Sequence, residues 1–287
     1  MKRGQKMKTS NTISKKLFAA VLAAVLGAAA LSACSNDSNS LNVDTSDPEI
    51  AAAVQAEVTD PIHFTTSKNA DGTLEIIEYS GTDKAIVIPT AIDGAAVTSI
   101  GYEAFRKNEY MESVVIPTGI NINSYPNERR GAFEECKNLK TVVVDSTEIG
   151  VYAFADSYHV EKLVLGNSVG RIGRRAFFYA GLLTDVDFNQ VKVIEDKAFY
   201  HAFGEDYPVS ITLPESVTEI GEEAFEHNTS LVSVTIENPA LIIGERALGY
   251  NSSESIVEGF TIIAPAGSTA EQYANENGIT FKPLTAN

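Results

Sequence analysis

The sequence predicts an α/β repeat solenoid built from stacked coils of roughly 22 residues. Two motifs that alternate along the chain predict this fold class. The first is a hexapeptide of the form Ile-Gly-x-x-Ala-Phe, and the second is a short run of apolar residues. A unit of this size buries its apolar face only against neighbouring units, so the coils are expected to stack into one continuous core.

The hexapeptide marks each coil by its last residue. These marker positions are separated by 28, 21, 23, 22, 26 and 23 residues and comprise Phe105, Phe133, Phe154, Phe177, Phe199, Phe225 and Leu248. We expect the glycine to need permissive backbone conformation. Alanine and phenylalanine would begin a short helical or 3-10 segment, with the ring filling the coil. Glu195 replaces the glycine and Leu248 replaces the phenylalanine in two copies, which predicts locally looser coils.

The apolar runs between the markers predict short strands, because alternation over a few residues is typical of strands. They are Val114-Val115-Ile116, Val142-Val143-Val144, Leu163-Val164-Leu165, Val186-Asp187-Phe188, Ile211-Thr212-Leu213 and Val234-Thr235-Ile236. Pro117 and Pro214 follow two of them and would end those strands, because proline has no N–H to donate. Strands one period apart predict a parallel sheet along one side.

The outward positions of these strands form the first candidate ligand surface. If the first and third residues of each run point inward, the residues between and before them point outward. The outward candidates for ligand binding are Thr141, Lys162, Asp185, Asp187, Thr212 and Thr235. Such small, lightly charged side chains would suit an extended peptide or a glycan. The alternative is that β-branched residues are there only because they form strands well.

Two coils are longer than the period and predict surface loops. One contains Tyr125 and the other contains Tyr207, and a binding pocket walled by these two rings would favour ligand recognition. The alternative is that the insertions are neutral.

Both ends of the repeat carry signals for a cap. Asp71-Gly72 separates residues 64–66 from residues 74–79, which predicts an N-terminal β-hairpin cap. Ser268-Thr269-Ala270-Glu271 reads as a capping box and predicts a C-terminal helix cap that ends near Gly278. Such caps would cover the apolar surface of the terminal coils.

The first 33 residues predict an export signal. Six basic residues precede an apolar stretch of residues 17–31, too short to span a bilayer, and no acidic residue occurs in this part. Leu31-Ser32-Ala33-Cys34 resembles the bacterial lipobox, so Cys34 would carry lipid and anchor the protein to a membrane. The alternative is an ordinary cleaved signal with a chance cysteine. Residues 34–60 are expected to form a flexible tether, within which the sequence is compatible with a brief alanine-rich helix around Glu49–Glu57, with Pro48 in its first turn.

The charge balance argues against several functional classes. Beyond residue 33, 16 basic residues face 38 acidic ones, a formal net charge of -22, so nucleic acid is not an expected partner. The scattered acidic residues favour a solvated exterior over a cation-binding role. The four histidines lack metal-ligand spacing, and we expect no metal, no cofactor and no catalytic residues. Cys136 is interpreted as a core thiol, not as a reactive one.

The hexapeptide, the following strand with its proline, and the stretch from Ala264 to Ala274 resemble the BspA-like leucine-rich-repeat family over residues 64–284. The resemblance implies a right-handed leucine-rich-repeat superhelix with a parallel β-sheet on the concave face, here over residues 61–287 with about seven coils. It also implies a cell-surface or secreted role, with adhesion to host proteins or matrix known for some members. The family defines no catalytic residues.

Three functional hypotheses remain open at this stage. The leading one is a lipid-anchored, non-enzymatic surface module that binds protein or glycan ligands. The second is an accessory capture subunit of an enzymatic or uptake system, which would need polar residues converging in a pocket. The third is a passive spacer in the envelope, which a featureless concave face would favour.

Overall fold

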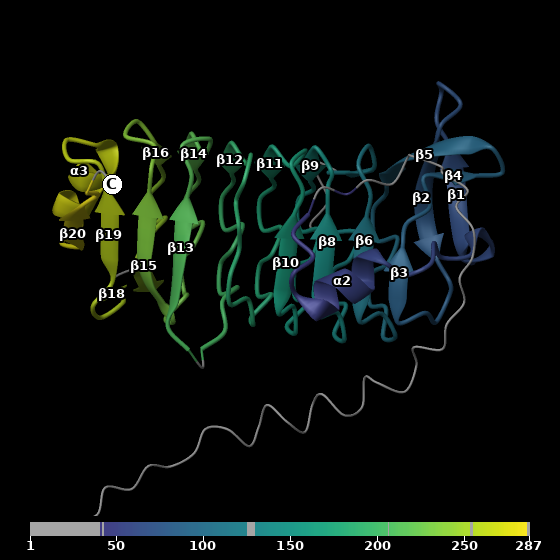
Figure 1. Cartoon of the computed structure of the whole chain (residues 1–287), viewed down its shortest axis with the longest axis horizontal. Coiled ribbons are helices and arrows are strands. Elements are labelled where there is room, and N and C mark those ends of the chain that lie inside the picture. The colour runs from purple at the N-terminus through teal and green to yellow at the C-terminus, as the bar shows by residue number, and fades with distance from the viewer. Residues whose placement is uncertain (1–40, 42, 125–129, 206, 253–254, 286–287) are drawn as a thin grey trace, which may run out of the picture. The chain divides into compact units, whose positions relative to one another are not determined.

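The computed structural model describes residues 41, 43–124, 130–205, 207–252 and 255–285, which belong to the unit Asn39–Asn287. The signal segment, Cys34 and Tyr125 lie outside the described residues. The unit is a β-solenoid in which successive coils lie side by side (Figure 1). The predicted repeat solenoid is therefore confirmed.

The longer strand of each coil builds two parallel sheets on one side of the solenoid. The first contains β3 (Ala85–Val87), β6 (Ser113–Ile116), β8 (Thr141–Val144) and β10 (Lys162–Leu165). The second contains β13 (Val209–Leu213), β15 (Leu231–Ile236), β19 (Thr261–Ala264) and β20 (Thr280–Pro283). Neighbouring strands pair in register, so Val115 lies beside Val143, and Thr212 lies beside Thr235.

The two sheets are separated at the coil where we predicted a strand over Val186-Asp187-Phe188. The structure has no strand there, so this prediction is wrong. The Asp187 carboxylate accepts a hydrogen bond from the Asn189 backbone N–H at 3.0 Å. Aspartate is disfavoured in strands because its side chain competes for backbone hydrogen bonds in this way. Val186 and Phe188 are nevertheless buried, so the inward positions keep their place in the core.

A third parallel sheet consists of five two-residue strands. Four of these strands end in an isoleucine that is buried in the core. These strands are β9 (Glu148–Ile149), β11 (Arg171–Ile172), β12 (Val193–Ile194), β14 (Glu219–Ile220) and β16 (Ile242–Ile243). The motif glycine follows every one of these strands except β12, which Glu195 follows, and it is needed for a reason other than the one we expected. A Cβ at Gly173 would lie 2.8 Å from the Ile149 carbonyl oxygen, so close approach between coils requires glycine there.

The Ala-Phe segments are turns and not the expected helical or 3-10 segments. The reason lies in their hydrogen bonds, because every second N–H group bonds to the neighbouring coil and only the others close local turns. The Phe133 N–H donates to the Ala153 carbonyl at 2.7 Å, and the Phe177 N–H donates to the Ala198 carbonyl at 2.8 Å. A residue with positive φ occurs two positions before most markers, such as Arg175 at 58°. The backbone therefore pairs coil to coil and does not close a local helix.

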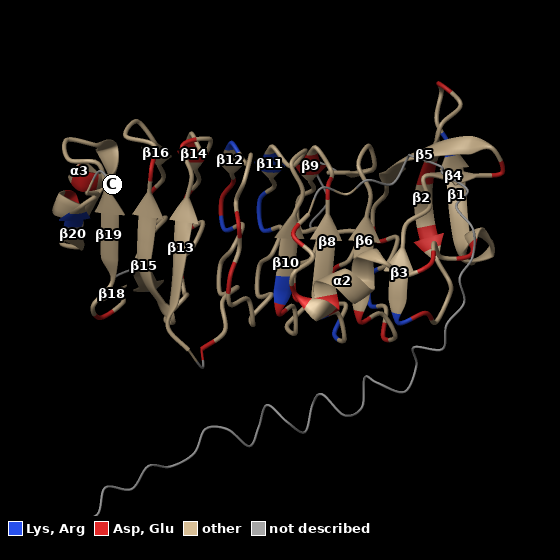
Figure 2. Cartoon of the chain, in the orientation of Figure 1, with Lys and Arg blue, Asp and Glu red and all other residues tan. Residues whose placement is uncertain are grey.

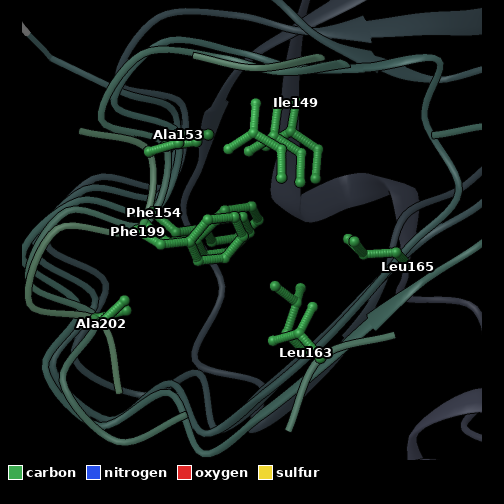
Figure 3. Packing of buried hydrophobic residues seen from close by; sticks show 14 of the residues in the cluster. Ile149, Ala153, Phe154, Leu163, Leu165, Phe199 and Ala202 are labelled. Atoms are coloured by element: carbon green, nitrogen blue, oxygen red, sulfur yellow. The ribbon is translucent and has the colours of Figure 1, made fainter. Parts of the chain in front are cut away.

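The phenylalanine markers form a continuous stack through the core (Figure 3). Six rings from Phe105 to Phe225 lie nearly parallel to their neighbours, with centroids 4.6 to 5.3 Å apart. Tyr79 extends the stack at one end, 5.2 Å from Phe105. At the other end Leu248 takes the ring position, and its carbonyl accepts a hydrogen bond from the Tyr273 hydroxyl.

The two ends of the described unit have distinct elements. At the start, η2 (Pro61–His63) leads into β1 (Phe64–Lys68), which pairs antiparallel with β2 (Leu74–Tyr79). Next, β4 (Ala91–Ile92) pairs antiparallel with β5 (Ala95–Ile100), and β5 pairs with β7 (Asn121–Ile122). Near the end, β17 (Tyr250–Ser252) pairs with β18 (Ser255–Ile256), and α3 (Thr269–Glu276) has Ser268 as its N-cap.

One further helix, α2 (Pro48–Val54), lies across β3, β6 and β8 on the outer side of their sheet (Figure 1). Asp47 is its N-cap, and Pro48 stands in its first turn. This is the brief helix that the sequence allowed within the expected tether, and it begins at Pro48 as expected. Its position on the sheet was not predicted.

Candidate functional site

The outward side of the longer strands is called the strand face here. One row of residues runs along its centre, set by the register of the paired strands and interrupted at Asp187. The row consists of Val87, Val115, Val143, Val164, Asp187, Thr212, Thr235, Ile263 and Lys282. The row is apolar in the first four coils and mostly polar after them. This is the surface on which the sequence placed most candidate ligand-binding residues.

Helix α2 covers the apolar part of the row. Ala53 is 4% exposed and packs with Val87, Val115 and Val143 in an apolar cluster separate from the main core. Further apolar residues pack against this cluster, namely Leu41, Val43, Ile50, Val54, Ala56 and Val164. A contiguous valine surface would otherwise face water. The cover therefore explains why valines occupy outward positions here.

Charged groups hold the first turn of α2. The Lys162 ammonium lies 2.7 Å from an Asp47 carboxylate oxygen and 2.8 Å from a Glu49 carboxylate oxygen. In Figure 2 the basic segment of β10 lies beside the acidic start of α2. Partial burial alone would lower the pKa of Lys162, but hydrogen bonds to both carboxylates outweigh it and raise the pKa. The Lys162 hydrogen bond likewise lowers the pKa of Asp47.

A cavity of about 670 Å³ opens where the apolar row ends. It lies between the chain before α2 and the two coils around β10, and it includes the site where the two sheets separate. Its polar lining consists of Asp44, Ser46, Asp47, Glu161, Lys162, Asn167, Thr184, Asp185, Asp187 and Asn189, and its apolar lining of Val43, Ile50, Leu163, Val164 and Leu165. One cation among several carboxylates makes the site acidic, with both hydrogen-bond donors and acceptors. Such a site is suited to polar ligands with hydroxyl or amide groups.

Beyond the cavity the strand face is open and polar. Ser210 and Ser233 lie beside each other, with their hydroxyl oxygens 2.8 Å apart. Two residues further along the same strands, Thr212 is exposed and Thr235 is half-buried. These hydroxyls continue from the cavity along β13 and β15, so a ligand longer than the cavity would meet them next.

The structure brings some of the predicted site residues together and separates others. Lys162, Asp185 and Asp187 gather at the cavity. Thr141 is 5% exposed, so it is not available as an open contact. Tyr207 is 74% exposed and does not line the cavity.

Sequence reasoning missed the contribution of α2 and the residues before it. Asp44, Asp47 and Ile50 line the cavity, although that part of the chain was assigned to a tether. A signal was present in the runs Val114-Val115-Ile116 and Val142-Val143-Val144. Strands that are apolar at every position are typically buried on both faces.

A second charged cluster lies on the turn side of the solenoid. Glu223 and Glu226 are nearly buried, and both face Arg246. Burial and the neighbouring Glu223 raise the pKa of Glu226 to about 7. Despite burial, hydrogen bonds to Lys197 and Glu226 lower the pKa of Glu223 to about 2. Within the described ranges, no group of three or more metal-binding side chains converges.

Residues 98–205 and 200–264 match the BspA type leucine rich repeat region, in 6 copies. No curated protein matches. Among solved structures, a leucine rich cell surface protein from Faecalibacterium prausnitzii A2-165 is 23% identical, with a TM-score of 0.51. The match covers 73% of this chain and 55% of that one.

A leucine rich repeat protein from T. pallidum is 18% identical, with a TM-score of 0.45, and the match covers 80% of this chain and all of that one. Among the described residues, none of the helices is long and apolar enough to cross a membrane. The match in 6 copies covers more than half of the sequence and coincides with the coils of the solenoid. The chain therefore belongs to the BspA-type leucine-rich-repeat family.

Proposed function

We propose that the protein is a bacterial cell-surface lipoprotein whose repeat domain binds protein or glycan ligands without catalysis, in adhesion or contact with host or matrix. Lipid on Cys34 would hold it to the membrane. Family membership supports a repeat binding module at the surface. The lipobox-like tetrapeptide before Cys34 supports the anchor.

The observation that carries the binding role is the cavity at the end of the apolar row. It joins Lys162 and the carboxylates of Asp185 and Asp187 to the open hydroxyl row of β13 and β15. A ligand with several hydroxyl or amide groups, either a glycan or an extended peptide, would match these donors and acceptors. A passive spacer would have no need for such a polar cavity within an otherwise regular ladder.

The binding role is tested with glycan and protein arrays probed by the soluble repeat domain together with α2. The double variant Asp185→Lys and Asp187→Lys should lose at least tenfold in affinity for any ligand that the wild type binds. Glu215→Lys with Glu258→Lys is the matched control, because both glutamates are exposed and lie outside the cavity lining. Equal binding by both double variants would place the ligand elsewhere. Failure of the wild type to bind any arrayed ligand would favour a spacer.

The anchor is tested separately in cells. Cys34→Ala should move the protein from the membrane fraction to the soluble or secreted fraction, because acylation needs the thiol. Metabolic labelling with a palmitate analogue should mark the wild type and leave the variant unlabelled. Unchanged membrane association together with absent labelling of the wild type would contradict lipidation.

A further inference from the structure

We propose that the valine part of the strand face is a receptor groove for a short amphipathic helix with an acidic first turn. In this proposal α2 is the resident occupant of the groove. A helix of the same pattern on a partner protein displaces it. The groove adjoins the polar cavity, with which it shares Lys162 and Val164, but it recognises an apolar helix face and not a polar ligand.

Helix α2 packs through one of its sides on the outward face of β3, β6 and β8. Ile50, Ala53 and Val54 stand at helical spacing of three and four residues, so they share one face of α2. That face packs on Val115 and Val143, which are 2% and 0% exposed beneath it. Helix recognition by other proteins uses the same spacing of apolar anchors.

The solenoid does not need α2 to complete its core. The inward residues of the same strands, Val114 and Val142, belong to the main core cluster with the phenylalanine stack. The outward residues Val115 and Val143 belong to the separate cluster with α2. Because the strands pair with each other through their backbones, the ladder persists when α2 leaves. The groove would then present its valines to a partner.

The attachment of α2 is suited to release. A helix of seven residues is too short to be stable alone, so α2 folds only while it is docked. Its start is held by the ion pairs of Lys162 with Asp47 and Glu49, whose side chains are 36% and 65% exposed, and ion pairs that are partly open to solvent contribute only modestly to stability. After the helix, Thr59 is fixed to Val87, whose N–H donates to the Thr59 hydroxyl at 2.9 Å. Residues 55–58 connect this fixed point to the helix and would serve as the hinge.

The groove defines which helix it accepts. Lys162 at one end selects carboxylates at the N-cap and in the first turn, in the places of Asp47 and Glu49. The position of Ala53 requires a small residue, because it is buried among three valines. The partner is therefore a protein with an exposed helix that begins with acidic residues and continues with small and β-branched ones. A long aromatic residue at the central position would be excluded by its volume.

The test uses the full chain and a fluorescent peptide of residues 43–58 as the probe. In the wild type the tethered α2 competes at high effective concentration, so the peptide should bind weakly. Ile50→Asp with Ala53→Asp changes only α2 and should release it, so the peptide should bind at least tenfold more tightly than to the wild type. Hydrogen exchange should show loss of protection in α2 and unchanged protection in β6 and β8.

Charge exchange tests the predicted direction of the helix. Adding Lys162→Glu to the α2 variant should weaken peptide binding, and a peptide carrying Asp47→Lys and Glu49→Lys should restore it. A scrambled peptide is the control and should not bind. Three results would overturn the proposal: α2 staying protected despite both aspartates, protection being lost throughout the solenoid, or release of α2 without gain of peptide binding.

Discussion

The phenylalanine stack is the main candidate for the source of stability, and Phe177→Ala is its sharpest test. Phe177 is fully buried between Phe154 and Phe199, with ring centroids 5.2 Å away on each side. The substitution removes a ring and leaves a cavity. The flanking rings have little freedom to close it, because hydrogen bonds between coils fix their backbones.

The expected loss of unfolding free energy for Phe177→Ala is about 4 kcal/mol. Truncating a buried phenylalanine to alanine costs about 3–5 kcal/mol. Each lost aromatic pair adds about 0.5–1.5 kcal/mol to simple burial, which argues against the lower end of that range. Phe177→Leu is the matched control, since Leu248 occupies the corresponding place in the last copy of the motif. Leucine should cost roughly 1–2 kcal/mol.

Urea unfolding followed by circular dichroism measures both variants against the wild type. The order of stability should be wild type, then Phe177→Leu, then Phe177→Ala, with unchanged spectra of the folded states. A loss below about 1 kcal/mol for the alanine variant would show that the coils collapse around the gap. It would then follow that stacking is a consequence of the repeat and not a source of its stability.

Three other predictions concern single side chains. The pKa of Glu226 is raised to about 7 by burial and by Glu223, so its protonated form favours folding, and this contribution is lost as pH rises from about 4.5 through 7. Glu226→Gln should therefore gain stability relative to the wild type between pH 5 and pH 8, and parallel melting temperatures would contradict this. Gly173→Ala should destabilise by about 1–3 kcal/mol in urea unfolding, because its Cβ would lie 2.8 Å from the Ile149 carbonyl oxygen. Burial raises the pKa of Cys136 to about 12, so mass spectrometry should find this thiol alkylated by iodoacetamide only after unfolding.

The sequence predicted the inward half of the fold well, because inward positions obey one rule in every coil. A residue such as Ile172 or Phe177 meets the same residue type one coil away, and both are fully buried. Periodicity therefore identifies the core without knowledge of its geometry. Departures from the repeat motif are accommodated by contacts close to the departing residue. Glu195, in the glycine position, places its carboxylate 2.6 Å from the Arg174 backbone nitrogen.

The backbone of the turn side was predicted less well. The Ala-Phe pair has helix-compatible residues, so its local sequence does not distinguish a helical segment from a turn. The neighbouring coil determines that a turn forms, because its carbonyl groups accept hydrogen bonds from the N–H groups of Phe154 and Phe177. These hydrogen bonds exist only after coils have stacked, and local propensity contains no information about them.

The candidate site depended on tertiary contacts even more strongly. Lys162, Asp185 and Asp187 were identified from register alone, and they do lie around one cavity. Asp47 and Ile50 also line this cavity, and they belong to a segment more than 100 residues before Lys162 in the sequence. No local pattern joins that segment to β10, because its contacts there are an ion pair with Lys162 and packing against Val164, and neither residue's own neighbours in sequence indicate such a partner.

The change from valine to aspartate along the strand face links the two proposed binding functions. A surface of contiguous valines needs a cover, and α2 supplies one over the first coils. The acidic first turn of α2 requires a cation, which Lys162 provides. One coil further on, Asp185 and Asp187 would repel the same turn, since like charges in a shared cavity disfavour each other. On the proposals above, the aspartates would disfavour α2 beyond the valine part, which would leave the hydroxyl row open to a polar ligand.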